Sequence, residues 1–185
     1  CGQYDTVTEV MWVTGAALFI RLADYREVGG LDDHFFAHME EIDLCWRLRS
    51  RGKKLVCIPQ SVVYHVGGAT LKKENPRKTF LNFRNNLLML YKNLPDKELE
   101  HVLFIRGILD RVAALVFYLK KDRANARAVM QARREFEDIR YSFAASRIEN
   151  IMKSTDEMIP ERTHFSILMK YYLLGKKHFS QLKLF

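Results

Sequence analysis

Residues 40–59 read EEIDLCWRLRSRGKKLVCIP, and this stretch decides the fold class. Its apolar residues Leu44, Cys45 and Leu48 fall on one face of a helix, and Gly52 follows as a natural helix stop. Residues 54–58 then form a short apolar run that ends at Pro59, which is typical of a buried strand. A helix that leads directly into a strand predicts an α/β unit.

The flanking segments extend this α/β unit in both directions. Upstream, residues 7–21 are rich in β-branched and apolar side chains and predict two strands joined by a turn at Thr14-Gly15. Gly29-Gly30 indicates another turn before the helix. Downstream, residues 61–66 predict one more strand, with His65 at its end.

Beyond residue 70 the sequence pattern becomes helical. Asn75-Pro76 predicts an N-cap followed by proline at the first helical position, and apolar residues then recur at spacings of three and four up to Leu94. Pro95-Asp96 restarts a helix that runs to about residue 121, and further helices are expected over residues 122–153 and after Pro160. We therefore predict an α/β piece over residues 1–94 and a helical extension over residues 95–185.

The composition is that of a folded soluble chain. It has 185 residues, 48% apolar and 28% charged, with a mean hydropathy of −0.20, which argues against disordered and collagen-like classes. The three cysteines have no ligand or CxxC spacing, so a reducing compartment is expected. Residues 1–69 carry seven Lys and Arg against nine Asp and Glu, whereas residues 70–185 carry 23 against 13. The helical extension is therefore basic and suits an anionic surface.

An acidic cluster, Glu40, Glu41 and Asp43, opens the predicted helix. One interpretation is structural, because backbone N–H groups at a helix start favour negative charge. The other is functional: a helix start and the strand end at His65 can meet at one edge of an α/β sheet, where ligands bind. A carboxylate and an imidazole meeting there would make an acid/base or metal site.

Further motifs accompany the acidic cluster in a defined order. They are Trp12-Val-Thr-Gly15-Ala16, Tyr25-x-x-Val28-Gly29-Gly30-Leu31-Asp32-x-x-Phe35-Phe36, Glu40-Glu41-Ile-Asp43-Leu-Cys-Trp-Arg47, Gly52-x-x-Leu-x-x-x-Pro59 and His65. Over residues 7–94 the chain thereby resembles family-2 glycosyltransferases, most closely their rhamnosyltransferase-like branch, which are inverting enzymes of the GT-A fold. The resemblance implies the acceptor-side half of the catalytic domain, with a partial GT-A (Rossmann-like) sheet followed by a mostly α-helical region.

The resemblance also implies a reaction and a set of site residues. The enzyme would transfer a sugar from a nucleotide-sugar donor to a hydroxyl of a glycan or lipid-linked acceptor, with inversion, in bacterial polysaccharide or glycolipid assembly. By position in the family motif, Glu41 is the base and Glu40 its neighbour in the catalytic pair. Asp43 also fits a structural partner of Arg47. The residues implied in substrate binding are Trp12, Gly15, Ala16, Asp32, Asp33 and Asp43.

A metal ion is implied in the same way. The family uses Mg²⁺ or Mn²⁺, and His65 matches a histidine ligand found in some members. The family's Asp-x-Asp motif does not occur in this sequence, so the remaining ligands are expected upstream of Cys1. We therefore expect a fragment of a longer enzyme that is inactive alone. The processive-synthase motif Gln-x-x-Arg-Trp is also absent, which favours a single-addition enzyme.

The basic helical extension leaves several interpretations open. Residues 99–119 mix aromatic, aliphatic and cationic side chains, which suits either an interfacial helix on anionic lipid or ordinary packing into a helical core. The first would place the enzyme in the cytoplasm, at the inner face of the plasma membrane. A homo-oligomer through the C-terminal helices is another alternative. A third alternative is a basic module that binds nucleic acid or a protein partner, although no nucleic-acid motif is present. A fourth is a non-catalytic glycosyltransferase-like scaffold.

Overall fold

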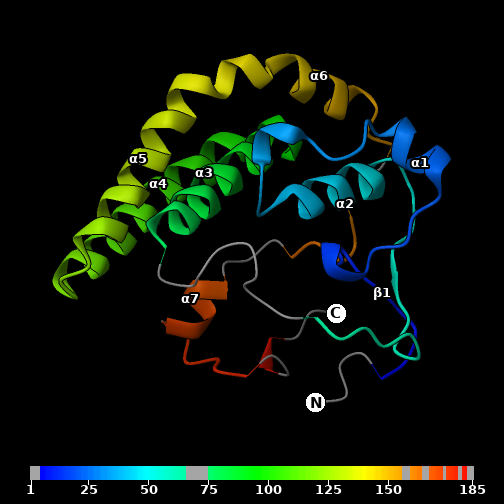
Figure 1. Cartoon of the computed structure of the whole chain (residues 1–185), viewed down its shortest axis with the longest axis horizontal. Coiled ribbons are helices and arrows are strands. Elements are labelled where there is room, and N and C mark those ends of the chain that lie inside the picture. Colours follow the sequence, from blue (N-terminus) through cyan, green and yellow to red (C-terminus); the bar gives the residue numbers. More distant parts are fainter. Residues whose placement is uncertain are drawn as a thin grey trace.

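The computed structural model describes residues 5–65, 75–155, 159–163, 167–172, 174–178 and 181–182. Within these ranges the chain is a mostly helical α/β structure with a two-stranded sheet, which confirms the predicted fold class (Figure 1). The helices and strands are β1 (Thr8–Glu9), α1 (Leu22–Glu27), α2 (Glu40–Ser50), β2 (Val56–Cys57), α3 (Pro76–Asn93), α4 (Asp96–Leu119), α5 (Arg123–Ile139), α6 (Ala144–Met152) and α7 (Ile167–Tyr172). Three 3-10 turns, η1 (Gly15–Ala17), η2 (Asp33–Phe35) and η3 (Arg140–Phe143), complete the order.

The strands are much shorter than the sequence predicts. β1 and β2 pair antiparallel, with Thr8 opposite Cys57 and Glu9 opposite Val56. Of the elements predicted over residues 7–21, the first strand forms only as β1, and the turn at Thr14-Gly15 forms as η1, which Thr14 caps. The predicted second strand is wrong, because the chain leads from η1 into α1. Residues 61–65 are exposed and form no strand, so His65 does not end one. An extended segment needs a neighbouring strand for its backbone hydrogen bonds, and β1 and β2 have only each other among the described residues.

The helices follow the sequence closely, because their signals are local. α2 ends at Ser50, two residues before Gly52, whose φ of +75° suits glycine, and the Asn75 side chain accepts a 2.9 Å hydrogen bond from the Arg77 N–H at the start of α3. The single helix predicted over residues 122–153 is divided into α5, η3 and α6. Ser142 Oγ donates to the Ile139 carbonyl at this division, a bond that competes with regular helical hydrogen bonding.

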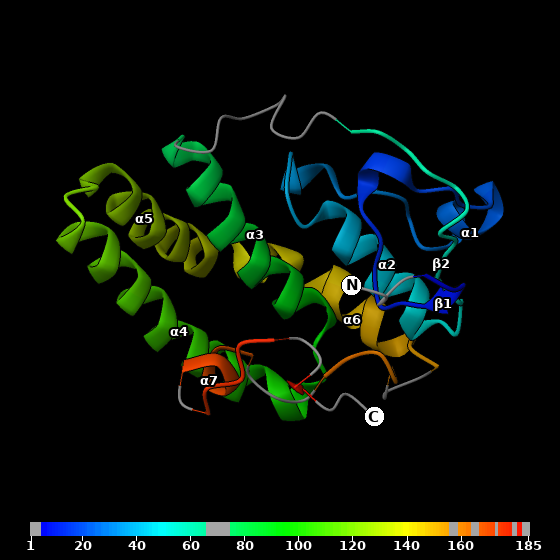
Figure 2. The same cartoon turned by 90° about the horizontal axis from the view of Figure 1, so that it is seen from below.

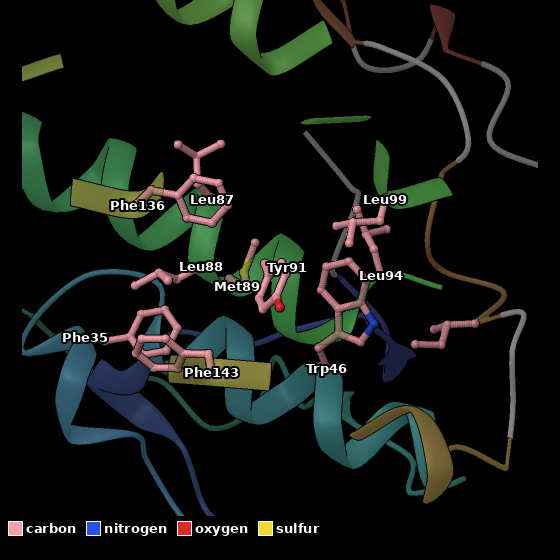
Figure 3. Close-up of a cluster of buried hydrophobic side chains, with 11 residues drawn as sticks. Phe35, Trp46, Leu87, Leu88, Met89, Tyr91, Leu94, Leu99, Phe136 and Phe143 are labelled. Atoms are coloured by element: carbon pink, nitrogen blue, oxygen red, sulfur yellow. The ribbon is translucent and has the colours of Figure 1, made fainter. Parts of the chain in front are cut away.

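One apolar cluster joins the two halves of the chain. Figure 3 shows Phe35 and Trp46, from the α2 region, packed against Leu87, Leu88 and Tyr91 of α3. Leu99, Phe136 and Phe143 extend the cluster toward α4, α5 and η3. A smaller cluster, built on Val28, Leu44, Cys45, Leu48 and Leu55, fixes α2 against the strand region. The α2 helix is thus held from both sides.

The helices beyond residue 75 form a layered group. Figure 2 shows α3, α4 and α5 side by side, with the α4–α5 connection at the end far from β1 and β2. α6 continues from α5 and packs on α3. In the part of the chain that is described, no helix is both long enough and apolar enough to cross a membrane.

Candidate active site

The helix that carries the acidic pair begins after a strained loop. Phe36, His38 and Met39 have φ angles of 60°, 70° and 74°, in the left-handed region that non-glycine residues rarely adopt. Each such residue costs on the order of 1–3 kcal/mol, so surrounding contacts must hold it in place. Met39 is the N-cap of α2 and makes no side-chain capping bond there.

Asn85 of α3 supplies those contacts. Its side-chain Nδ2 donates to the backbone carbonyls of Phe35 at 2.8 Å and of Ala37 and His38 at 2.9 Å each. Arg84 Nε donates to Asn85 Oδ1 at 3.0 Å, which fixes the orientation of the amide. Asn85 is fully buried. A single amide from α3 therefore fastens the loop that positions the start of α2.

The acidic pair carries polar atoms that no group among the described residues satisfies. Oε2 of Glu40, Oε2 of Glu41 and Nε2 of His38 are buried without a hydrogen-bond partner among the described residues. Burial raises the pKa of Glu40, and the neighbouring charge of Glu41 raises it further. Buried polar atoms are normally hydrogen-bonded. A carboxylate oxygen with no protein partner at a helix start is available to accept a proton or a hydrogen bond from a bound molecule.

The predicted Trp12–Ala16 segment lies beside this pair. A Cβ built on Gly15 would lie 3.8 Å from the Cβ of Glu41, which places η1 directly against the first turn of α2. Gly15 and Ala16 are exposed, and Trp12 is 47% exposed and belongs to neither apolar cluster. An exposed aromatic ring suits stacking against a sugar ring better than it suits a core position.

Asp43 lies in a buried charge network rather than at the surface. Its carboxylate accepts hydrogen bonds from Arg47 Nε at 3.0 Å, Lys92 Nζ at 2.9 Å and Asn93 Nδ2 at 2.7 Å, and its side chain is fully buried. Lys92 Nζ also contacts Asp32 Oδ2 at 2.7 Å. We call Asp32, Asp43, Arg47, Lys92 and Asn93 the buried charge network. It ties α2 to α3, so Asp43 acts in this structure as a structural anchor.

Asp32 and Asp33 have different surroundings. Burial alone would raise the pKa of Asp32, but hydrogen bonds and charge from Lys92, with smaller contributions from His34, lower this pKa to about 2. Asp32 is therefore ionised at neutral pH and compensates the buried Lys92 ammonium. Asp33, in η2, is exposed. Of the two predicted substrate-binding carboxylates, Asp33 is the more accessible.

His65 lies at the end of the first described range and is exposed. Among the residues that the structure describes, no three His, Cys, Asp or Glu side chains are grouped so that they could hold a metal ion. The described residues therefore do not form a divalent-metal site by themselves. The assignment of His65 as a metal ligand stays a prediction that needs further ligands from elsewhere.

Lys92 and Asn93 are absent from the sequence-derived site, and so is the buried, loop-fastening role of Asn85. A polar residue on an amphipathic helix is normally expected on the solvent-exposed face. Asn85 is instead fully buried, and Lys92 is almost fully buried. One signal was present. Arg84, Asn85 and Asn86 interrupt the apolar pattern of α3 in direct succession, which is consistent with a polar contact across the core.

The Asn85 contact leads to a first prediction. Leu at position 85 has a similar size but no donor, so one buried and two partly buried carbonyls lose their partner in Asn85→Leu, and we expect the unfolding free energy to fall by about 2 kcal/mol. Urea unfolding of the chain measures this loss. Amide hydrogen exchange at residues 36–40 should also accelerate. Asn82→Leu is the matched control, because Asn82 Nδ2 bonds only to Lys78 of its own helix; equal losses in both variants would contradict the assigned role.

Comparison with known proteins connects this geometry to a chemistry. No protein-family model matches the chain, and no solved structure matches it significantly. The pre-mycofactocin glycosyltransferase of Mycobacterium tuberculosis is 31% identical over 141 residues, which cover 70% of this chain and 29% of that protein. The N-acetylglucosaminyl-diphospho-decaprenol L-rhamnosyltransferase of the same species is 38% identical over 56 residues, 30% of this chain and 18% of that protein.

A third relative comes from another bacterium. Rhamnosyltransferase WbbL of Escherichia coli K12 is 36% identical over 61 residues, which cover 33% of this chain and 22% of that protein. The chain spans less than a third of the length of each of these curated relatives. The chain is therefore a relative of glycosyltransferases, rhamnosyltransferases among them, over part of their length.

Proposed function

We propose that this chain is the acceptor-side part of an inverting glycosyltransferase, with Glu41 as the general base. The donor is a nucleotide sugar, and the acceptor is a hydroxyl of a glycan or of a lipid-linked glycan. The similarity to named glycosyltransferases supports the class of reaction. The name of one relative, which acts on a sugar attached to diphospho-decaprenol, supports a lipid-linked acceptor.

The observation that carries the proposal is the missing hydrogen-bond partner of the Glu41 carboxylate among the described residues. Its Oε2 is buried but has no hydrogen-bond partner among the described residues, next to the exposed Gly15-Ala16 turn. The strained loop before α2 is fastened by Asn85, so the backbone at the start of α2, from which Glu41 extends, is held in place. Strain that the surroundings maintain is commonly found at functional sites.

The reaction is a single displacement. As the acceptor oxygen forms its bond to the anomeric carbon of the donor, the bond from that carbon to the phosphate oxygen breaks, and the nucleoside diphosphate leaves with the electron pair. The acceptor hydroxyl loses its proton to the Glu41 carboxylate in the same step. Trp12, three residues before Gly15 in the chain, would stack on a sugar ring, and Asp33 would accept a hydrogen bond from a sugar hydroxyl.

The donor half of the site would come from sequence outside this chain. There we place the remainder of a GT-A sheet, the nucleotide-binding residues and the Asp-x-Asp carboxylates. Mg²⁺ or Mn²⁺, bound by those carboxylates with His65, would neutralise charge on the departing diphosphate. The matched fraction of the curated relatives, 29% at most, is compatible with such a missing half.

A transfer assay on the longer protein that contains this chain tests the proposal. The protein is incubated with nucleotide derivatives of rhamnose, glucose and N-acetylglucosamine, and with a short-chain polyprenyl diphosphate sugar as acceptor. We expect one donor to give an acceptor product heavier by one sugar, with release of an equal amount of nucleoside diphosphate. Binding of a nucleotide sugar without any product would contradict the proposal and favour a non-catalytic scaffold.

A further inference from the structure

Helix α4 buries one face and leaves an apolar face uncovered. Its fully buried residues, Leu99, Gly107, Asp110 and Ala114, lie toward the neighbouring helices of the group. On another face, large apolar residues recur at spacings of three and four. Their exposed fractions lie between 50% for Val112 and 70% for Leu119. We call this the α4 apolar face; its members are Phe104, Ile108, Val112, Leu115 and Leu119.

Cations that form no ion pair with another described residue accompany the α4 apolar face. Arg111 lies at its middle and is exposed; its guanidinium bonds to the Gly107 carbonyl of its own helix. Lys120 and Lys121 follow its end and are exposed, and Arg123 begins α5 beside them. The acid within residues 101–121 is Asp110, which is almost fully buried and paired with Arg106 and Arg133. Asp122, at the turn, is engaged in capping Asn125.

This combination points to one kind of partner. We propose that the α4 apolar face and its cations dock on an anionic lipid bilayer, with the apolar side chains at the acyl boundary and the cations among the headgroups. Each cation near an anionic surface strengthens binding by roughly fivefold. The face extends over 15 residues of helix, about 22 Å, and its basic end lies at the α4–α5 connection, far from β1 and β2 (Figure 2).

A second copy of the chain fits this face less well. In an antiparallel two-fold contact along α4, Arg111 at the middle of the face would lie opposite Arg111 of the other copy. Within residues 101–121 no exposed carboxylate compensates this Arg111 pair; the exposed Glu100, one turn before Phe104, would lie toward the basic end of the other helix instead. A lipid surface supplies the missing negative charge along the whole face. The proposal does not depend on sugar transfer, although a lipid-linked acceptor would give the docking a purpose.

Vesicle cosedimentation of the 185-residue chain tests the proposal. The chain is mixed with vesicles of phosphatidylcholine alone or of phosphatidylcholine with phosphatidylglycerol. We expect binding to the mixed vesicles and not to the neutral ones, and release when salt is raised to 1 M, where the Debye length is only about 3 Å. Equal binding to both kinds of vesicle, or binding to neither, would overturn the proposal.

Two sets of variants locate the surface. Arg111→Gln, Lys120→Gln and Lys121→Gln together should weaken binding to the mixed vesicles on the order of 100-fold, because three cations are lost. The matched control removes the same charge from exposed positions at the opposite end of the molecule, with Arg21→Gln, Arg26→Gln and Lys54→Gln, and should change binding little. Equal weakening by both sets would mean that net charge alone drives binding, and the proposed face would be wrong.

A third variant separates lipid docking from self-association. Leu115→Gln with Leu119→Gln should reduce vesicle binding without lowering the unfolding free energy, because both side chains are exposed. Sedimentation velocity without lipid gives the oligomeric state of the original chain and of this variant. A dimer that the double variant dissociates, together with no vesicle binding by the original chain, would assign the face to a second copy and contradict the proposal.

Discussion

If the proposed function holds, Glu41→Gln in the longer protein that contains this chain lowers the rate of sugar transfer by about 10²–10⁴-fold. Gln has the size of Glu but cannot take the acceptor proton, and general-base help is needed only in the transition state. Donor binding should be unchanged, because the base acts on the acceptor. The measurement is product formation at saturating donor and acceptor, with donor affinity measured separately by calorimetry.

The structure adds two controls to this experiment. Oε2 of Glu41 has no protein partner among the described residues, so Glu41→Gln should not destabilise the fold, and urea unfolding checks this. Glu40→Gln, at the adjacent position of α2, should lower transfer much less, because the proposal assigns the proton transfer to Glu41. Transfer by Glu41→Gln within tenfold of the original rate would refute the assignment of the base.

The second large effect concerns folding rather than chemistry. Lys92→Met should lower the unfolding free energy by about 3–5 kcal/mol, because it removes the ammonium that pairs with two carboxylates in the core and leaves Asp43 with Arg47 as its remaining cationic partner. Lys92 Nζ contacts Asp32 at 2.7 Å and Asp43 at 2.9 Å and lies 5.0 Å from the centre of the Phe35 ring. Met keeps most of the length of the side chain, so the loss reports the charge.

Lys54→Met is the matched control for that measurement. The substitution and the change in net charge are the same, but Lys54 pairs with Glu9 at the exposed edge near β1. Exposed ion pairs contribute little to stability, so this variant should unfold at nearly the original urea concentration. If both variants lost the same stability, the buried charge network would not be the anchor between α2 and α3.

The sequence predicts the helices well because their determinants are local. The stop at Gly52 and the cap at Asn75 are each read from two or three adjacent residues, and the structure confirms both. The strands fail for the opposite reason. A run such as residues 61–65 becomes a strand only if another strand lies beside it, and composition cannot say whether one does.

In the candidate site, too, the local features are predictable from the sequence and the long-range contacts are not. The acidic pair at the start of α2 and the adjacent Gly15 turn are apparent from motif order. The support beneath them is not, because Asn85 reaches carbonyls 47 to 50 positions earlier in the chain and Lys92 pairs with acids 49 and 60 positions away. Those contacts depend on how α3 packs against α2. Only the folded chain reveals that these polar residues are buried.

The stereochemistry of the product tests the central claim most directly. A single displacement assisted by the Glu41 carboxylate inverts the anomeric carbon, so a donor with an α-linked phosphate must give a β-linked product, and the reverse. The anomeric configuration of the isolated product, measured from its one-bond carbon–hydrogen coupling by NMR, reports this outcome. We predict inversion. Retention of the donor configuration would contradict the displacement and, with it, the role given to Glu41.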